Sequence, residues 1–289
     1  MIRQLTIIGV GLIGGSPARA LKQVGHVGEV VGCSRNQAHL QDAQKLGVID
    51  RFTTDIGAAV QGADVVLLAV PLGAMEDCFR AMVGHLGPDT VVTDAGSAKA
   101  SVVAAAQTAF GTLPAGFVPG HPIAGTEQSG VQASFAELYR NRRVILTPLA
   151  SSSPAALEAV RNMWQATGAF VDEMGVEHHD EVLAATSHLP HLLAYGLVDT
   201  LVSMDESEEI FRFAAGGFRD FTRIAASDAV VWRDICLANQ TALLAVLERY
   251  RADLEKLTEL VRRGDGEALA ALFTRAKAAR GRFVDQLEK

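Results

Sequence analysis

The sequence has few cysteines, no excess of positive charge and no long uninterrupted apolar run. Its three cysteines, Cys33, Cys78 and Cys236, are scattered and form no CxxC pair, which argues against a disulfide scaffold or a zinc site and favours a reducing compartment. The formal net charge of −7 leaves no basic surface for a nucleic acid. No apolar run reaches the ~20 residues of a membrane helix, and a strand pattern begins just after Met1, so no signal peptide is expected. These absences predict a cytoplasmic protein without a nucleic-acid or membrane partner.

The composition is that of a globular protein with a substantial core. Of the 289 residues, 49% are hydrophobic and 20% are charged. This length fits one large domain or two ordinary ones. The negative total charge does not exclude an anionic substrate, because such a substrate requires positive groups only at its own site.

The N-terminal segment has the strand, turn and helix pattern of a dinucleotide-binding fold. A β-branched run over 5–8 precedes GVGLIGGS, and a helical pattern follows. In this GxGxxG arrangement Gly9 supplies the turn, Gly11 lets the backbone approach a pyrophosphate, and Gly14 allows close packing of helix and strand. Pro17 is tolerated only in a first helical turn, so it predicts the helix start. Free N–H groups at this helix terminus favour phosphate binding. The predicted cofactor contacts here are Gly9, Gly11, Leu12, Ile13 and Gly14.

The residues after the second predicted strand indicate which cofactor is bound. An NAD site usually carries Asp or Glu here to bind the ribose 2′-hydroxyl, but this chain has Ser34 and Arg35. A hydroxyl and a guanidinium suit a 2′-phosphate, and the acidic side chain that would repel it is missing. NADP is therefore predicted in preference to NAD, with an exposed loop arginine as the simpler alternative. A further buried strand over 63–71 ends at Val70 and Pro71, which complete the predicted cofactor site.

The segment Gly120–Glu127, GHPIAGTE, lies between the strand-rich and the helical halves of the chain. Two glycines and a proline predict a loop. The loop contains His121, which can take up a proton near neutral pH, and a carboxylate. Ser97 follows the strand predicted over 90–94, and it fits either a helix cap or a ligand contact at the carboxyl edge of the sheet. Two more strands are predicted over 143–148 and 169–172.

After Gly175 the strand pattern gives way to helices. These are predicted over 179–203, 206–213, 228–262 and 266–287. We expect the helix over 228–262 to be continuous, with Ser227 as its cap and Gly264 just past its end. A helix of this length is difficult to bury in a small subdomain. Packing against a second copy of the chain is the simplest account, and an intrachain bundle is the alternative. The predicted domains are 1–174 and 175–289.

Two segments of the helical half carry candidate histidines. His188 and His191 lie three apart on one predicted helix face, with Pro190 expected to kink the helix. A metal site is disfavoured because no third ligand is evident, so core or capping histidines are the alternative. His178 and His179 are expected at a solvated helix start, without a functional role.

Two further segments combine positive charge with an aromatic ring. Gly216 begins GGFRDFTR, in which Arg219 and Arg223 lie on one helix face. Surface ion pairing is the simpler reading of either arginine, and the spacing does not choose between them. Trp232 is most simply a packing residue.

Together these segments resemble the prephenate/arogenate (cyclohexadienyl) dehydrogenase family of tyrosine biosynthesis. The matching segments, in order, are GVGLIGGS from Gly9, DAGSAK from Asp94, GHPIAGTE from Gly120, TSHLPH from Thr186 and GGFRDFTRIAASD from Gly216. The resemblance spans nearly the whole chain. It implies an α/β Rossmann-type dinucleotide-binding domain followed by an all-α dimerisation domain. The chain departs from the family pattern at Pro17 and at Ser34-Arg35.

By this resemblance the chain is a homodimeric, NAD(P)-dependent enzyme that oxidatively decarboxylates prephenate, L-arogenate or both. Hydride passes from the hydroxyl-bearing ring carbon to the nicotinamide, and His121 accepts the hydroxyl proton. Ser97 shares the hydroxyl hydrogen bond, and Arg223 pairs with a substrate carboxylate. The implied substrate contacts are Arg223, His191, His188, Glu127, Trp232 and Gly216.

Two alternatives stand beside this reading. A β-hydroxyacid-type dehydrogenase also joins a Rossmann domain to helices, but it requires a catalytic lysine early in the helical half, and residues 179–221 contain none. A non-catalytic NADP-binding regulatory module is the second alternative. It gives no chemical reason for the presence of both His121 and Arg223.

Overall fold

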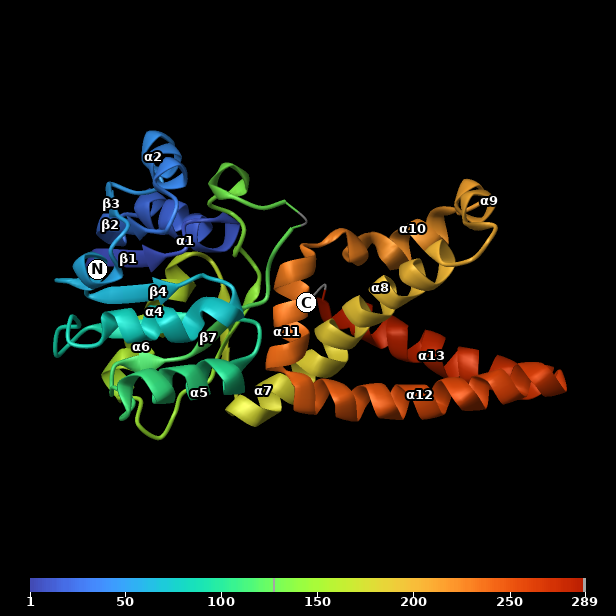
Figure 1. Ribbon diagram of the computed structural model, residues 1–289. Coiled ribbons are helices and arrows are strands. Elements are labelled where there is room, and N and C mark those ends of the chain that lie inside the picture. Colours follow the sequence, from blue (N-terminus) through green and yellow to red (C-terminus); the bar gives the residue numbers. More distant parts are fainter. Residues whose placement is uncertain (127, 288–289) are drawn as a thin grey trace. The chain divides into compact units, whose positions relative to one another are not determined.

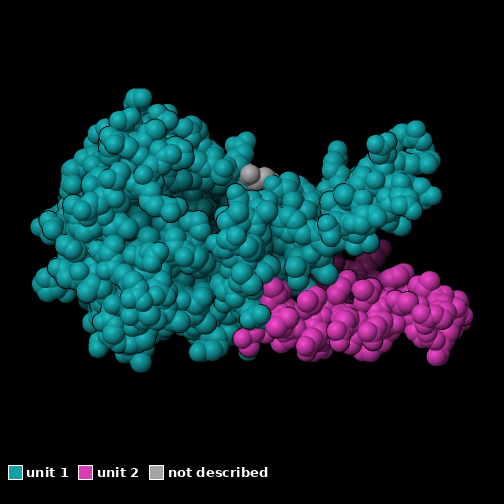
Figure 2. All heavy atoms as spheres, in the orientation of Figure 1, with its two compact units in different colours: residues 1–240 teal, residues 241–289 magenta. Residues whose placement is uncertain are grey.

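The computed structural model describes residues 1–126 and 128–287. The chain divides into two compact units, 1–240 and 241–289 (Figure 2). The first unit contains both β-sheets, and the second contains most of α12 (Gln240–Arg263) and α13 (Gly266–Leu287). The predicted boundary between 174 and 175 lies within the first unit and stays a prediction. No single helix of the described chain is long and apolar enough to cross a membrane; α11 (Ala229–Ala238) and α12 meet that criterion only when counted together across a break.

The first sheet has the strand order of a dinucleotide-binding fold. Its six parallel strands are β1 (Ile2–Ile8), β2 (Val27–Cys33), β3 (Arg51–Thr53), β4 (Val65–Leu68), β5 (Val91–Asp94) and β6 (Phe117–Val118). Their order in the sheet is β3-β2-β1-β4-β5-β6. This arrangement has its switch point between β1 and β4, and ligands of such sheets bind at the carboxyl ends of the strands there. The predicted Rossmann-type fold is therefore confirmed.

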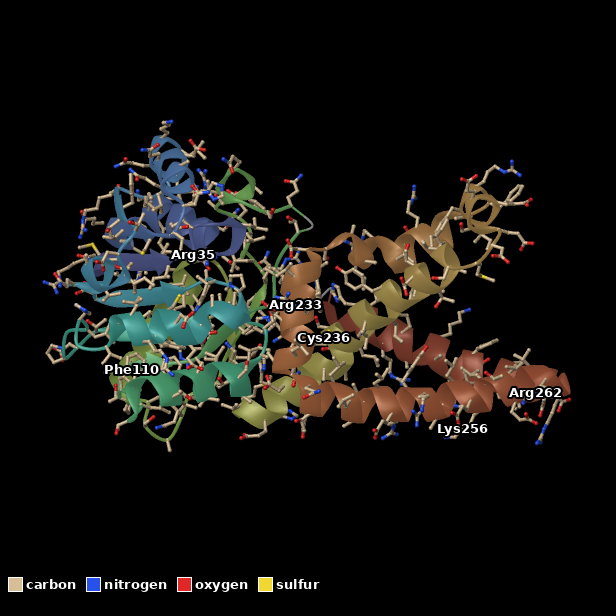
Figure 3. All side chains as sticks on the ribbon, in the orientation of Figure 1. Arg35, Phe110, Arg233, Cys236, Lys256 and Arg262 are labelled. Carbon is tan, nitrogen blue, oxygen red and sulfur yellow. The ribbon has the colours of Figure 1, made fainter. Side chains whose placement is uncertain are left out.

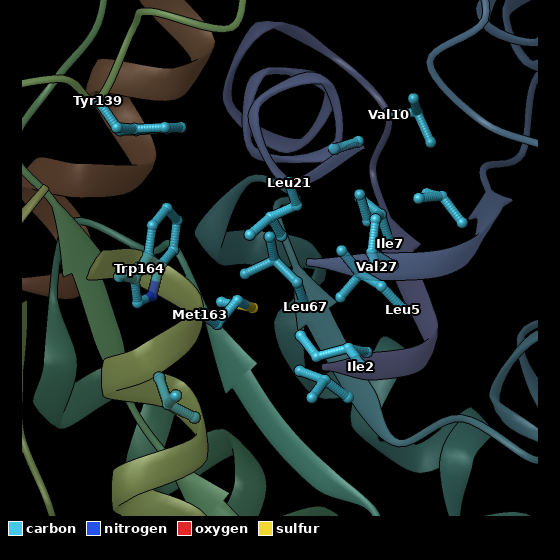
Figure 4. Packing of buried hydrophobic residues seen from close by; sticks show 14 of the residues in the cluster. Ile2, Leu5, Ile7, Val10, Leu21, Val27, Leu67, Tyr139, Met163 and Trp164 are labelled. Carbon is cyan, nitrogen blue, oxygen red and sulfur yellow. The ribbon is translucent and has the colours of Figure 1, made fainter. Parts of the chain in front are cut away.

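Helices cover both faces of this sheet (Figure 1). One apolar cluster joins the strands to α1 (Leu12–Gln23), α2 (Gln37–Lys45) and α6 (Pro154–Ala166). A second cluster joins them to α3 (Ile56–Val60), α4 (Met75–Met82) and α5 (Lys99–Phe110). Leu5, Ile7 and Trp164 are completely or almost completely buried in the first cluster (Figure 4). Burial of each such side chain stabilises the fold by roughly 1.5–3 kcal/mol.

Pro17 lies inside α1, not at its start, so the predicted helix start was wrong. The helix begins at Leu12, with Gly11 as its N-cap. A proline in a helix interior leaves the carbonyl oxygen four residues earlier without its N–H partner. Here that oxygen belongs to Ile13, and it accepts a hydrogen bond of 2.7 Å from the hydroxyl of the buried Tyr139. Tyr139 packs edge-on against Trp164 (Figure 4), so a residue distant in sequence makes Pro17 tolerable.

His121 lies in a strand and not in the predicted loop. The second sheet consists of β7 (Gly120–Pro122), β8 (Arg143–Leu146) and β9 (Phe170–Glu173). In the antiparallel pair of β7 and β8, His121 is opposite Ile145. The local glycine and proline content disfavours a strand, but pairing with β8 outweighs that preference. The pairing fixes the backbone that carries the imidazole.

The C-terminal part of the first unit is helical. Its elements are α7 (Val176–Leu183), a π-helical turn (Ala184–His188), α8 (Leu189–Val202), α9 (Ser207–Arg212), α10 (Gly216–Thr222), a 3₁₀ turn (Arg223–Ala226) and α11 (Ala229–Ala238). The continuous helix predicted over 228–262 is wrong, because Asn239 separates α11 from α12. Its predicted cap is also wrong: Asp228, not Ser227, accepts hydrogen bonds from the N–H groups of the first turn. Gly264 follows the end of α12 with φ +66°, which confirms its predicted place.

Candidate active site

A buried ion pair at the carboxyl end of β5 holds the start of β7. The Asp94 carboxylate pairs with the Lys99 ammonium, and both side chains are completely buried. Asp94 also accepts hydrogen bonds from the N–H groups of Gly96, at 2.7 Å, and Gly120, at 3.1 Å. Lys99 donates to the Gly120 carbonyl at 2.6 Å. Burial lowers the pKa of Lys99, and the Asp94 charge opposes that shift. The pair therefore fastens the residue before His121 to the end of the Rossmann strand.

His121 is the first member of a chain of buried polar groups. Its Nδ1 lies 2.9 Å from Nε2 of His179, and Nδ1 of His179 lies 2.8 Å from Oδ1 of Asp180. The Asp180 carboxylate accepts hydrogen bonds from the backbone N–H groups of Lys99, at 2.7 Å, and Ala100, at 2.9 Å. Asp180 thus caps α5 from a different helix. Burial, followed by the charges of neighbouring groups, holds the pKa of His121 well below its usual value, so the imidazole is neutral at pH 7.

The expectation that His179 is solvated was wrong. Its side chain is completely buried, whereas that of the adjacent His178 is 65% exposed. Helix α7 packs against α5 (Figure 1), and its buried positions include His179 and Asp180, whereas His178 lies outside this buried face. The buried Leu183 lies four residues later on the same helix face as His179. That spacing was the available sequence signal.

Asn239 connects the break after α11 to the histidines, and the sequence did not identify it as a site residue. Its buried amide nitrogen donates a hydrogen bond of 2.8 Å to the Asp180 backbone carbonyl and lies 3.1 Å from Nδ1 of His188. The other ring nitrogen of His188 is buried and has no hydrogen-bond partner in the described part of the chain. Burial lowers the pKa of His188 to about 4. His188 also influences the pKa of His121, so the two predicted site histidines lie in one electrostatic environment.

The other predicted substrate contacts of the helical half gather around His191. The ring of His191 stacks on Trp232 with centroids 3.5 Å apart and an interplanar angle of 16°. Its Nδ1 donates to the Ser187 carbonyl at 2.9 Å. Burial lowers the pKa of His191, and the Arg223 charge lowers it further. The structure thus brings His191, Trp232 and Arg223 together.

Arg219 and Arg223 differ in their surroundings. Arg219 is 84% exposed and lies 3.9 Å from the Asp220 carboxylate, whereas the charge of Arg223 acts on His191. The placement favours Arg223 as the arginine of the site, a choice that spacing left open. Gly216 starts α10, and a Cβ there would meet no heavy atom within 4 Å. The predicted contact Glu127 lies outside the described residues.

Ser97 lies partly buried in the segment between β5 and α5. It does not cap α5, because the N-cap residue is Ala98 and the capping carboxylate is that of Asp180. No hydrogen bond links Ser97 to His121 within the residues described. Its backbone is near enough to His188 to influence the pKa of that histidine. Ser97 therefore borders the histidine cluster from the sheet side.

The glycine turn fits a dinucleotide. Gly9 has φ +95°, and a Cβ there would lie 2.4 Å from the Ala69 carbonyl oxygen. A Cβ on Gly14 would lie 2.2 Å from the Gly9 carbonyl oxygen, so glycine is required for the close contact of α1 with the turn. A Cβ on Gly11 would meet nothing within 4 Å, which leaves the backbone open to a ligand. Leu12 and Ile13 are the first two residues of α1. Their N–H groups lie at the helix N-terminus, which favours binding of an anion.

The remaining predicted cofactor residues lie at the same carboxyl edge. Strand β4 ends at Leu68, before the end predicted, so Val70 and Pro71 lie in the segment that follows it. Ser34 follows β2 directly, and its hydroxyl accepts from the Asn36 N–H at 3.3 Å. Arg35 is exposed beside it (Figure 3). Both residues are thus at the position where the second Rossmann strand meets the adenosine ribose of a bound cofactor.

One cavity of the first unit lies apart from these residues. A cavity of about 380 Å³ lies among segments that precede β5 and β6, and its lining includes Phe110 and Gly116. These segments are at the amino edge of the sheet, opposite the edge that carries His121. No ionisable side chain lines the cavity, so it supplies no group for acid–base chemistry.

The parallel sheet with its open glycine turn, and a buried neutral histidine beyond the carboxyl end of its strands, define the class of protein as a dinucleotide-binding oxidoreductase. Comparisons with known proteins define the family. The family model described as "Prephenate dehydrogenase, nucleotide-binding domain" matches residues 17–173, and "Prephenate dehydrogenase, dimerization domain" matches residues 175–275. The chain belongs to the prephenate dehydrogenase family.

Individual relatives resemble nearly the whole chain. A cyclohexadienyl dehydrogenase of Zymomonas mobilis is 41% identical over 97% of this chain and 96% of its own length. A crystal structure of prephenate dehydrogenase from A. aeolicus, in complex with hydroxyphenyl propionate and NAD+, matches with a TM-score of 0.91, 37% identity, and coverage of 98% and 99% of the two chains. The arogenate dehydrogenase of Synechocystis matches with a TM-score of 0.82, 27% identity, and coverage of 97% and 99%.

Proposed function

We propose that the protein catalyses the NAD(P)-dependent oxidative decarboxylation of prephenate, L-arogenate or both. The observation that carries this proposal is the state of His121. The imidazole is buried and neutral, and Nδ1 is its one nitrogen that hydrogen-bonds another described residue. Nε2 is thus available to accept a proton from a substrate hydroxyl. The names of two relatives, a prephenate dehydrogenase and an arogenate dehydrogenase, support the two substrates.

In the proposed reaction His121 handles the hydroxyl proton. The nicotinamide cofactor, when bound, supplies the acceptor for the hydride of the hydroxyl-bearing ring carbon. As the bond between this ring carbon and its hydroxyl oxygen gains double-bond character, the hydroxyl proton moves to Nε2 of His121. The bond between the ring and its carboxylate then breaks, its electron pair makes the ring aromatic, and CO₂ leaves. The proton returns to the phenolate oxygen, so His121 ends the cycle neutral.

The remaining residues bind and orient the substrate. Arg223 pairs with a substrate carboxylate, which suits a planar guanidinium. Ser97 shares the bond to the ring hydroxyl with His121. The proposed lining of the substrate site comprises His188, His191, Glu127, Trp232 and Gly216. Correct orientation is the main task, because aromatisation supplies the driving force.

The residues proposed to bind the cofactor support a preference for NADP. Gly9, Gly11 and Gly14, with Leu12 and Ile13, receive the pyrophosphate, while Val70 and Pro71 border the cofactor from the end of β4. Ser34 and Arg35 offer a hydroxyl and a guanidinium to a 2′-phosphate. The complex of the A. aeolicus relative contains NAD+, so the preference for NADP depends on these two residues of this chain.

A homodimer completes the proposal. Apolar side chains on α12 and α13 are exposed in the single chain, among them Leu254 (48%), Val261 (66%) and Phe273 (58%). Apolar surface of this kind is typical of a protein interface, and the family model over 175–275 is named for dimerisation. Light scattering in solution should give about twice the 30.6 kDa of the chain. A monomer at micromolar concentration would contradict the dimer.

The decisive experiment is an initial-rate assay that pairs prephenate and L-arogenate with NAD and NADP. Nicotinamide reduction at 340 nm, together with CO₂ release, is expected for at least one of the four pairs. Higher kcat/KM with NADP is the result expected from Ser34 and Arg35. Absence of turnover in all four pairs, in protein that still binds NADP, would overturn the proposed function.

A further inference from the structure

We infer that His179 and Asp180 fix the tautomer of His121, so that its proton is on Nδ1 and its lone pair is on Nε2. This inference rests on the proposed role of His121 as the proton acceptor. His179 and Asp180 are positioning residues in this account, because neither is proposed to touch the substrate. Their effect is to make the acceptor nitrogen of His121 available before substrate arrives.

The hydrogen-bond chain determines the position of each proton. Ionised Asp180 can only accept, and its Oδ1 lies 2.8 Å from Nδ1 of His179, so that nitrogen is the donor. A neutral imidazole has one N–H, and Nε2 of His179 is therefore an acceptor. It lies 2.9 Å from Nδ1 of His121, which must carry the proton. The lone pair of His121 is left on Nε2.

The environment of Asp180 keeps its carboxyl group ionised. Two backbone N–H groups at the start of α5 donate to its two oxygens, and the positive end of a helix favours a negative charge. A protonated carboxyl would lose part of these interactions. Although burial acts in the opposite direction, the hydrogen bonds from His179, Lys99 and Ala100 hold the pKa of Asp180 below its usual value.

His179 is neutral in the same surroundings. Its ring is completely buried, and burial together with the nearby Lys99 charge lowers its pKa, against the opposing effect of Asp180. A doubly protonated ring would donate to His121 and reverse the order of protons. The charged and titratable groups that act on His121 and His179 are Asp94 and Lys99 at the sheet edge, His188 in the π-helical turn, and Asp180 in α7.

The hydrogen bonds from His121 through His179 to Asp180 also stabilise His121 after it has accepted the substrate proton. When His121 takes the substrate proton it becomes positively charged, and its Nδ1–H bond to His179 becomes charge-assisted. Asp180 supplies the negative charge at the far end of the chain. Loss of that charge should make the imidazolium less stable, and His121 should become a weaker base. A merely structural role for Asp180 does not predict this change in basicity.

The test compares Asp180→Asn and His179→Gln with the parent protein in pH profiles of kcat. For Asp180→Asn we expect kcat to fall about 10- to 100-fold, less than the roughly 10²–10⁴-fold ascribed to general-base catalysis, because the base itself is retained, and we expect the acid limb to move to lower pH. His179→Gln keeps an acceptor for Nδ1 of His121 but breaks the link to Asp180, so kcat should fall while KM and NADP affinity change less than about threefold. His178→Gln is the matched control, because its side chain is 65% exposed, and it should leave kcat and the acid limb unchanged.

A second measurement needs no turnover and covers the case in which Asp180→Asn does not fold. Nitrogen-15 NMR of histidine-labelled protein, assigned with His121→Asn and His179→Gln, reports which ring nitrogen carries the proton. The expected state at pH 7 is the Nδ1–H tautomer of both His121 and His179. An Nε2–H tautomer at His121, or normal kcat with an unmoved acid limb in both variants, would overturn the inference. If the parent protein turns over neither substrate, the proposed function fails while the NMR result still decides the tautomer.

Discussion

A single imidazole, that of His121, is assigned the proton transfer, and its substitution separates binding from chemistry. Asparagine at this position retains a polar side chain of similar reach but cannot accept the proton. We expect His121→Asn to lower kcat by roughly 10²–10⁴-fold, the range of general acid–base catalysis. The NADP dissociation constant should stay within about twofold, because the glycine turn is unchanged. Initial rates and cofactor titration test this, and full retained activity would exclude His121 as the base.

The burial of His121 also predicts the pH range of activity. Burial and the neighbouring His179, Lys99 and His188 lower its pKa, so the imidazole stays unprotonated below the ordinary histidine value of about 6.5. The acid limb of the kcat profile should therefore lie below pH 6.5. Rates measured between pH 5 and 8 in buffers of constant ionic strength test this. An acid limb at or above 6.5 would mean that another group limits the reaction.

The two arginines of the α10 segment provide a matched pair. Arg223 acts electrostatically on His191, while Arg219 is 84% exposed beside Asp220. Arg223→Ala should raise KM steeply, by about 10- to 100-fold if it removes a charge-assisted pair of roughly 1.5–3 kcal/mol. Arg219→Ala should change KM less than about twofold. Equal effects of the two substitutions would contradict the assignment of Arg223.

Among the elements, α1 depends on a hydrogen bond from outside the helix. Tyr139 donates to the Ile13 carbonyl that Pro17 cannot satisfy. Tyr139→Phe removes this donor and should destabilise the protein by about 1–3 kcal/mol, the cost of an unsatisfied buried carbonyl. In a Pro17→Ala background the new N–H can donate to Ile13, so the same tyrosine substitution should cost less. Urea unfolding of the four variants measures the coupling, and additive effects would refute this compensation.

The elements that were predicted correctly are those decided by local pattern. The strand, glycine turn and helix around Gly9 are all encoded within a short segment, and the structure has them in the expected order. The helix break at Asn239 is different, since it depends on hydrogen bonds to Asp180 and His188. Burial of His179 likewise depends on the contact of α7 with α5. Such partners are distant in the chain, and no local preference reports them.

The candidate site divides in the same way. Motifs predicted His121, His191 and Arg223 as site residues, and the structure places each beside groups with which it interacts. Asp180 and Asn239, which belong to the hydrogen-bond network around His121 and His188, are not part of any such motif. Asp180 acts through backbone N–H groups of another helix, and Asn239 acts through a backbone carbonyl and a ring nitrogen. Their roles follow from the tertiary arrangement, which has to be known before the hydrogen-bond partners can be assigned.

At the scale of the whole molecule, buried neutral histidines link folding to pH. Burial lowers the pKa of His121, His179 and His188. As pH falls below the ordinary value of about 6.5, the unfolded chain binds protons that the folded chain does not, so stability falls with pH. Each such histidine contributes a slope of up to about 1.4 kcal/mol per pH unit, until its folded pKa is reached. For His188 that limit is about 4, so its contribution extends over the range from about 6.5 to about 4.

Urea unfolding followed by tryptophan fluorescence at pH 7.5 and 5.5 tests this linkage. Both tryptophans, Trp164 and Trp232, belong to the first unit, which also contains the histidines, so the signal reports the relevant part of the chain. The parent protein should lose stability at pH 5.5, and His188→Gln should lose up to about 1.4 kcal/mol less per pH unit. His178→Gln should lose as much as the parent, because the His178 side chain is 65% exposed and its surroundings change little on unfolding. Equal pH slopes for His188→Gln and the parent would show that His188 takes up its proton over the same pH range in the folded and the unfolded chain, which its burial and its bond with Asn239 argue against.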